Sequence, residues 1–206
     1  MQELTLSSAL TTELAALYQG LQADYERVAS SIPLTCTDCP DNCCDSWFFH
    51  HTYSEWAYLW QGLRQLDAQT LARLTVRAED YLRQSQEQLA AGQRPKIICP
   101  LNEQGRCRLY EHRLLVCRMH GIPATLTRPD GHTLRFPGCF HCQEIVQERY
   151  QQSTEVPAMN RTQLFSRMAA LESRLTGGNR QLYPKIKKTL AELIVQGPPM
   201  VGGLNR

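Results

Sequence analysis

Cysteine is the residue that most restricts how this chain can fold, because four of its nine cysteines fall within nine consecutive residues. Cysteines used as small buried hydrophobic residues would be scattered along the chain. The crowded segment runs from Cys36 to Cys44, and most of the remaining cysteines follow in the middle of the sequence. The nine positions are Cys36, Cys39, Cys43, Cys44, Cys99, Cys107, Cys117, Cys139 and Cys142.

Disulfide bonds are one explanation for these cysteines, and three features of the sequence disfavour them. An odd number of cysteines leaves one thiol over. The N-terminal segment MQELTLSSALTTEL has no basic stretch followed by an apolar one, so we expect no secretory signal. With 206 residues, of which 42% are hydrophobic, the chain can build a core without cross-links. Clustered thiols in a reducing compartment are typical of metal ligands, so the sequence predicts a metal-binding protein of the cytoplasm.

The charge of the chain is balanced, with 22 basic and 20 acidic residues and a formal net charge of +2. Such a balance gives no general attraction to nucleic acid or to an anionic membrane surface. No apolar run approaches the roughly 20 residues that a transmembrane helix needs. We therefore expect no membrane contact, and nucleic acid is disfavoured as a partner.

Helical periodicity marks the first half of the sequence outside the cysteine-rich loop. Apolar residues recur every three or four positions from Leu10 to Val28, and Pro33 ends this pattern because proline cannot continue the hydrogen-bond ladder. Ser54 suits the N-cap of a short helix that reaches about Leu66. Asp67 suits the N-cap of the following helix, which the glycine and proline near residue 92 end.

Short strands are expected only in the middle of the chain. Ile97–Leu101 and Arg106–Tyr110 flank an Asn-Glu-Gln-Gly turn, which indicates a small hairpin. Ala124–Arg128 and His132–Phe136 flank Pro-Asp-Gly, a second hairpin signal. Between the hairpins, residues 111–120 suit one or two helical turns.

Helical patterns return in the last third of the sequence. A weakly amphipathic helix is expected from Cys142 to about Gln152, and a second carries apolar residues from Leu164 to Leu175. Pro184 suits the first turn of a last helix. The Gly- and Pro-rich tail from Gly197 is expected to fray.

These patterns predict a mainly α, single-domain helical bundle with one or two small β-hairpins that carry cysteine metal ligands. We expect an N-terminal amphipathic helix in residues 1–33 and a cysteine-rich metal-binding core in residues 34–145. Residues 146–206 are expected to add C-terminal helices and a tail to the same domain.

The spacing of the cysteines suggests how they are used. Two residues separate the cysteines of the pair at 36 and 39 and of the pair at 139 and 142, which lets both sulfurs of a pair reach one metal. Cys43 and Cys44 are adjacent, and in extended backbone their side chains point to opposite sides. They therefore serve two different metals, or one of them packs elsewhere. Two four-ligand centres with one spare thiol fit the count, and so does a single centre with several structural cysteines.

The motifs resemble those of a known family. The residues concerned are Cys36-Thr-Asp-Cys39-Pro-Asp-Asn-Cys43-Cys44, then Cys99-Pro-Leu, Gly105-Arg-Cys107-Arg-Leu-Tyr110-Glu-His-Arg113 and Cys117-Arg118. This pattern is similar to the YkgJ-type cysteine-cluster family, described as a zinc- or iron-chelating domain that includes flagellin lysine N-methylase. The resemblance spans residues 36 to 142 and implies a metal centre, with a [4Fe–4S] cluster and methyl transfer in one branch. The chain departs from the family at Arg113-Leu114, where Arg-Pro is usual.

Thiolates bind both zinc and iron–sulfur clusters, so the ligand type does not choose between them. Cys-Pro at positions 39 and 99 is similar to the end of bacterial ferredoxin motifs. With the resemblance, this favours a [4Fe–4S] cluster, and zinc is the alternative. The strongest ligand candidates are Cys36, Cys39, Cys43 or Cys44, Cys107 and Cys117.

Charged neighbours of the cysteines widen the range of functions. Arg113 and Arg118 flank Cys117, where they offset thiolate charge or form a pocket for a small anionic ligand. His120 and His141 each lie within three residues of a cysteine and are the histidines best placed to replace one thiolate. We expect structural or redox use of the metal. A metal-dependent group-transfer enzyme, such as a protein methyltransferase, and a protein that passes metal to partner proteins are the alternatives.

Overall fold

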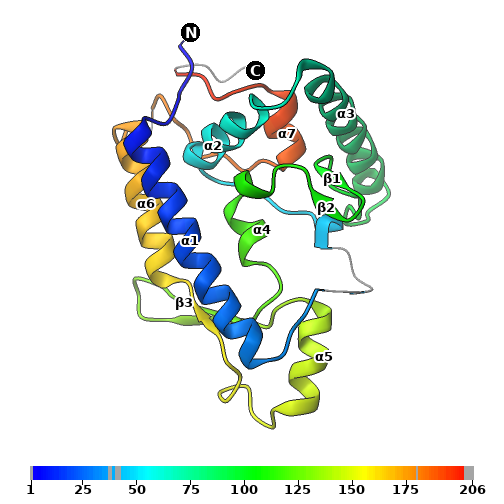
Figure 1. Cartoon of the computed structure of the whole chain (residues 1–206), viewed down its shortest axis with the longest axis vertical. Coiled ribbons are helices and arrows are strands. Elements are labelled where there is room, and N and C mark those ends of the chain that lie inside the picture. Colours follow the sequence, from blue (N-terminus) through cyan, green and yellow to red (C-terminus); the bar gives the residue numbers. More distant parts are fainter. Residues whose placement is uncertain (1, 37–38, 40–42, 180, 202–206) are drawn as a thin grey trace. The chain divides into compact units, whose positions relative to one another are not determined.

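Helices account for about half of this protein, which confirms the expected mainly α class. The structure is a computed structural model that describes residues 2–36, 39, 43–179 and 181–201 (Figure 1). Within these residues it contains seven α-helices and two small sheets. The chain divides into two compact units. The first unit is Met1–Thr11, Cys44–Cys117 and Leu171–Arg206, and the second unit is Thr12–Cys43 and Arg118–Ala170. The expected single-domain organisation stays a prediction.

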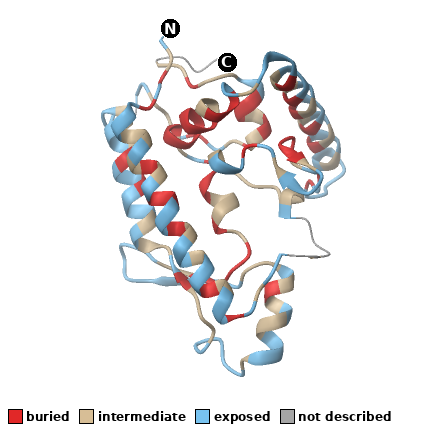
Figure 2. Cartoon of the chain, viewed as in Figure 1, coloured by how far each residue is buried: buried red, intermediate tan, exposed pale blue. Residues whose placement is uncertain are grey.

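The first unit has a helical core built from α2 (Tyr53–Leu63), α3 (Ala68–Ala90) and α7 (Leu190–Val195). Figure 2 shows buried residues over much of α2 and along one side of α3. The α3 helix packs against α7, because each presents an apolar stripe to the other. The core side chains that are almost inaccessible to solvent include Leu59, Leu63, Leu74, Ala78, Leu101, Leu114, Leu193 and Ile194.

Helix caps in the first unit are set by side chains that accept backbone hydrogen bonds. Asp67 accepts from the Thr70 N–H at 2.8 Å and caps α3, as predicted. The N-cap of α2 is Thr52, not Ser54, whose hydroxyl is instead buried against Glu172. The prediction that the last helix begins near Pro184 was also wrong. The α7 helix begins only after Thr189, which forms a capping box with Glu192.

The first hairpin lies in the first unit and is shorter than expected. Its strands are β1 (Asn102–Glu103) and β2 (Arg106–Cys107), joined by Gln104 and Gly105, both with positive φ. Two central residues with positive φ form the tight turn that matches strand twist. The prediction of a strand over 97–101 was therefore wrong, and Cys99 lies before the hairpin. Two short helices follow, η2 (Tyr110–His112) and α4 (Leu115–Met119), as predicted for this stretch.

The two ends of the chain meet in the first unit. The Leu4 N–H donates to the Pro199 carbonyl at 2.8 Å, and the Val201 N–H donates to the Gln2 carbonyl at 2.8 Å. Glu3 and Met200 form an antiparallel bridge. The prediction that the tail frays from Gly197 was wrong for residues 197–201, because this segment is paired like an edge strand. Residues 202–206 lie outside the described residues.

The second unit contains most of α1 (Ser8–Ser31), α5 (Phe140–Arg149) and the first part of α6 (Thr162–Thr176). The α1 helix ends two residues before Pro33, as predicted, and buries Leu14, Leu17, Tyr18, Leu21 and Val28.

The second unit also holds a three-stranded sheet. Its β3 (Ala124–Thr127) and β4 (Thr133–Phe136) form the predicted second hairpin, with Gly131 at φ 82° in the turn. The parallel strand β5 (Met159–Asn160) on the other side of β3 was not expected from the sequence. Among the described residues, no helix is long and apolar enough to cross a membrane.

Candidate metal centre

The nine cysteines fall into two groups that follow the two compact units. The boundary between the units passes between Cys43 and Cys44, so the adjacent cysteines belong to different groups. None of the nine, all of which are among the described residues, is joined to another in a disulfide bond. We name them the first cysteine set, which is Cys44, Cys99, Cys107 and Cys117, and the second cysteine set, which is Cys36, Cys39, Cys43, Cys139 and Cys142.

Backbone hydrogen bonds join three members of the first cysteine set, although they are far apart in the sequence. The Cys99 N–H donates to the Cys44 carbonyl at 2.8 Å, and the Asn102 N–H donates to the Cys99 carbonyl at 2.9 Å. Asn102 is paired directly with Cys107 across the first hairpin. The hairpin and the start of η1 (Cys43–Asp45) thus bring Cys44, Cys99 and Cys107 into one neighbourhood.

Two thiols of the first cysteine set, Cys99 and Cys117, have an ionisation that depends on the charge of other members of the set. Burial raises the pKa of Cys99 to about 12, and negative charge at Cys107 and Cys44 adds to this. A backbone hydrogen bond from Leu101 to the Cys99 sulfur acts in the opposite direction. Burial also raises the pKa of Cys117 well above its usual value, with further contributions from Cys99 and Cys107. A bound cation would reverse this balance, because positive charge stabilises thiolates.

The first cysteine set borders the hydrophobic core. Cys99 and Cys107 pack against the core of the first unit, together with Trp47. Burial, followed by the charge of Cys99, raises the pKa of Tyr81 to about 12. Apolar surroundings of this kind limit access of water to a metal site and influence its redox potential.

A buried acid and histidine also lie near the first cysteine set. Glu55 Oε1 accepts the Leu115 N–H at 2.7 Å and lies 3.9 Å from His50 Nδ1. Glu55 is 4% exposed, and its negative charge contributes to the raised pKa of Cys117. No spacing rule links Glu55 to Cys117, so the sequence carried no signal for this neighbour.

The second cysteine set is built around the start of α5. Cys139 is the N-cap of this helix, and its Sγ accepts the Cys142 N–H at 3.4 Å. The helix therefore begins at Phe140, two residues earlier than predicted. The Cys139 N–H donates to the Gly121 carbonyl at 3.0 Å. The other pair is held by a weaker turn, in which the Cys39 N–H lies 3.5 Å from the Cys36 carbonyl.

Tyr25 on α1 is close enough to four of the five thiols of the second cysteine set for their charges to affect its ionisation. Burial raises the pKa of Tyr25, and the charges of four thiols add to it. A Cβ atom at Gly121 would lie 2.5 Å from the Tyr25 hydroxyl oxygen, so this position requires glycine. From the sequence Tyr25 was only one member of the apolar stripe of α1. The four thiols are Cys36, Cys139, Cys43 and Cys142.

The adjacent pair Cys43 and Cys44 lies in the single 3₁₀ turn of η1 rather than in extended backbone. A 3₁₀-helix has three residues per turn, so neighbouring side chains diverge by about 120°. The charge of Cys43 affects Tyr25, whereas that of Cys44 affects Cys99. The extended backbone considered from the sequence was wrong for this pair. Both alternatives, two different metals or one thiol packed elsewhere, stay predictions.

The sulfurs do not converge on a common point in this structure. Among the described residues, no three His, Cys, Asp or Glu side chains are arranged so that they could hold a metal ion. Residues 37–38 and 40–42, within the cysteine-rich loop, lie outside the described residues. The assignment of the nine cysteines as ligands therefore stays a prediction.

The two arginines expected near the metal belong to different units. The Arg113 guanidinium lies 3.9 Å from the centre of the Tyr110 ring, and its charge lowers the pKa of Cys117. The Arg118 guanidinium lies 4.3 Å from the centre of the Tyr18 ring in the second unit. Each arginine thus stacks on an aromatic side chain. Their expected role in binding an anionic ligand stays a prediction.

The histidines near the cysteines have local partners. His141 Nδ1 lies 3.7 Å from Glu144 on the same helix. His112 stacks on the Tyr58 ring with 4.6 Å between the ring centres, and a side chain at Gly62 would overlap it. His120 is half-buried. Use of His120 or His141 in place of a thiolate stays a prediction.

Comparisons with known proteins found no match to this chain. No family model matches it, and neither a curated protein nor a solved structure does. The resemblance to the cysteine-cluster family, drawn from the motifs alone, therefore stays a prediction.

Proposed function

We propose that this protein binds metal through its cysteine thiolates and that the first cysteine set holds a [4Fe–4S] cluster. One observation carries the proposal: four thiols from three separate segments lie in one compact unit, in charge range of one another. Four cysteine thiolates are the usual ligands of such a cluster. The Cys-Pro at position 99 and the resemblance of the motifs favour iron over zinc.

The second cysteine set is proposed as a separate centre. It has five thiols, of which Cys139 and Cys142 are fixed at a helix start and Cys36 and Cys39 lie in a loop. The first cysteine set has no thiol to spare, whereas the second has one more than four ligands require. We therefore assign two centres to each chain.

Metal binding on this proposal draws the sulfurs together. The backbone already joins Cys44, Cys99 and Cys107, so smaller movements of side chains and of Cys117 would complete the set. Such closure couples metal binding to folding, because the bound metal cross-links segments that are distant in sequence.

The chain supplies the surroundings of the cluster. A bound [4Fe–4S] cluster supplies a one-electron redox couple or a structural cross-link. The Arg113 guanidinium offsets thiolate charge, and the Leu101 N–H is aimed at the Cys99 sulfur. Hydrogen bonds to sulfur and nearby positive charge both raise the potential of such a centre.

Metal analysis of protein isolated without oxygen tests the proposal. We expect a brown protein with bound iron and inorganic sulfide and a broad absorption near 400 nm (an approximate position for clusters of this type). A colourless protein that contains zinc and no iron would contradict the iron–sulfur assignment. Protein that binds neither metal would contradict the proposal as a whole.

The adjacent cysteines provide a matched pair of variants. Cys44→Ser removes a ligand of the first cysteine set and should abolish its cluster absorption. Cys43→Ser changes the neighbouring residue in the same 3₁₀ turn, but it should leave the first cluster in place. Equal loss of cluster in both variants would contradict the assignment of these cysteines to separate centres.

A further inference from the structure

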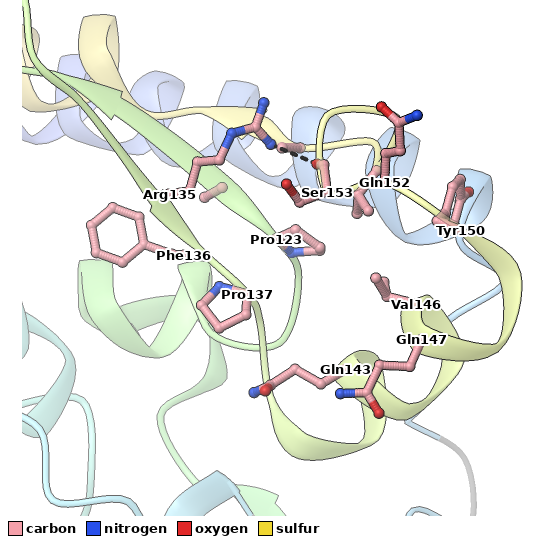
Figure 3. A pocket seen from close by; sticks show the side chains of 13 residues that line it. Pro123, Arg135, Phe136, Pro137, Gln143, Val146, Gln147, Tyr150, Gln152 and Ser153 are labelled. Atoms are coloured by element: carbon pink, nitrogen blue, oxygen red, sulfur yellow. Dashed lines mark hydrogen bonds between the residues drawn. The ribbon is translucent and has the colours of Figure 1, made fainter.

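The second unit contains a pocket that neither cysteine set accounts for. It has a volume of about 380 Å³ and lies between the strands β3 and β4, helix α5 and the segment after it (Figure 3). All of its lining residues belong to the second unit. The volume is within the range of pockets that bind small molecules.

The walls of the pocket are mainly apolar. Figure 3 shows Pro123 and Pro137 on one side and Val146 of α5 on the other. Glutamine residues add neutral polar groups, although Gln143 Nε2 already donates to the Gly138 carbonyl at 3.1 Å. The Tyr150 hydroxyl donates to the Ser31 carbonyl at 3.3 Å. None of the lining residues is acidic. Such a lining favours an apolar ligand with few polar atoms.

Arg135 is the one charged residue among those that line the pocket. Its Nη1 donates to the Ser153 carbonyl at 2.9 Å, which holds the guanidinium at the rim (Figure 3). No carboxylate pairs with Arg135 among the described residues. A guanidinium has five N–H donors in a planar fork suited to a carboxylate, and the bond to Ser153 uses only one of its edges.

We propose that this pocket binds a small apolar molecule that carries one carboxylate group. The prolines and Val146 contact the apolar part, and the Arg135 guanidinium binds the carboxylate. This site is independent of the metal, because its chemistry needs no residue of either cysteine set.

A pair of probes that differ only in charge tests the proposal. 4-Phenylbutyrate has an apolar body and a carboxylate, and 4-phenylbutyramide is its neutral counterpart. We expect calorimetric titration of the wild-type protein to show about tenfold tighter binding of the acid than of the amide, the effect of one charge-assisted hydrogen bond. Equal affinities for the two probes, or no binding of the acid at millimolar concentration, would overturn the proposal.

Two arginine variants test which side chain is responsible for the preference for the acid over the amide. Arg135→Gln should reduce the preference for the acid to nearly nothing while the amide binds as before. Arg128→Gln removes an arginine of the same hairpin that pairs with Asp130 at 3.0 Å and does not line the pocket. This variant should keep the full preference for the acid over the amide. An equal loss of that preference in both variants would show that binding of the acid depends only on overall charge, and it would overturn the assignment of Arg135 as the carboxylate-binding residue.

A third variant locates the apolar part of the site. Val146→Trp fills the pocket from α5 and should weaken binding of both probes at least about tenfold, as expected when one group excludes another from a cavity. Circular dichroism checks that the variant is folded. Unchanged affinity of a folded Val146→Trp variant for both probes would place their binding elsewhere.

Discussion

Glu55 shows how a single buried charge is stabilised in this protein. Burial alone would raise the pKa of this carboxyl, but the nearby His50, with its Nδ1 3.9 Å away, lowers it, and the Leu115 N–H and the Thr52 hydroxyl add hydrogen bonds that bring it below its usual value. A carboxyl with a lowered pKa in the folded state contributes stability above its unfolded pKa, and this contribution is lost as the pH falls through the folded value.

Glu55→Gln tests this stabilisation. At pH 7 we expect the variant to lose about 2 kcal/mol of unfolding free energy, because the hydrogen bonds to the charged carboxylate become neutral ones. The difference from wild type should begin to narrow as the pH falls below the usual value of 4.5, because Glu55 of the unfolded chain then takes up a proton before Glu55 of the folded chain does. Urea unfolding of both proteins at pH 7, 5, 4 and 3 measures this difference in unfolding free energy. A difference that stays constant over this range would contradict the lowered pKa.

Gly138 joins the second cysteine set to the backbone of residue 121. It has a φ of 90°, and an added Cβ would lie 2.6 Å from the Gly121 carbonyl oxygen and 3.0 Å from Cys142 Sγ. Gly131 also has a positive φ, of 82°, but no atom lies within 4 Å of an added Cβ. Substitution of Gly131 therefore tests the cost of the backbone conformation alone, whereas substitution of Gly138 tests that cost together with steric crowding.

The alanine variants of these glycines should differ in stability. Gly131→Ala pays only for the left-handed backbone and should cost about 1 kcal/mol. Gly138→Ala adds crowding against backbone and sulfur and should cost about 3 kcal/mol in total. Thermal and urea unfolding measure both values. An equal loss of unfolding free energy in the two variants would mean that the residues around Cys142 rearrange to accommodate the added methyl group.

At the scale of elements, local signals predicted some boundaries and misled at others. Asp67 caps α3, and Pro-Asp-Gly forms the turn between β3 and β4, because each acts through hydrogen bonds or φ preferences within a few residues. Ser54 has an equally good cap sequence, but Glu172, more than a hundred residues away, takes its hydroxyl and backbone N–H. The partner of a capping side chain is local only when no distant group competes for it.

The capping box of α7 is the element-scale feature whose loss should be easiest to measure. The Thr189 Oγ1 accepts the Glu192 N–H at 3.3 Å, and the Glu192 carboxylate accepts the Thr189 N–H at 2.6 Å. Thr189→Ala should destabilise the protein by about 1 kcal/mol. In a double-mutant cycle with Glu192→Ala, the two costs should be less than additive, because the residues share both hydrogen bonds. Additive costs would show that the box does not act as a unit.

At the scale of the whole molecule, the two cysteine sets make different demands on the chain. The first cysteine set draws on a 3₁₀ turn, a hairpin and α4, whereas the second draws on a loop and the start of α5. Metal in the first set would therefore cross-link the first unit in particular.

Amide hydrogen exchange measures how much this cross-link slows local opening of the first unit. When the cluster is reconstituted with iron and sulfide without oxygen, we expect the amides of Cys99, Asn102 and Arg108 to exchange about 100-fold more slowly, as for a ligand at about 100 times its dissociation constant. In the Cys44→Ser variant, which lacks one ligand of the first cysteine set, the same amides should show no slowing, and this provides the control. Unchanged exchange at residues 99–108 in iron-loaded protein would contradict binding at the first cysteine set.

The sequence by itself determined the features that depend on short-range physics: the mainly α class, the end of α1 before Pro33, the cap of α3 and the hairpin around Gly131. It also identified the nine cysteines as candidate metal ligands. Only the tertiary structure decided which cysteines share a unit, because that depends on which distant segments pack together. The same holds for Tyr25 among the thiols, for Glu55 near Cys117 and for the pocket beside α5, since long-range packing leaves no periodic trace in the sequence.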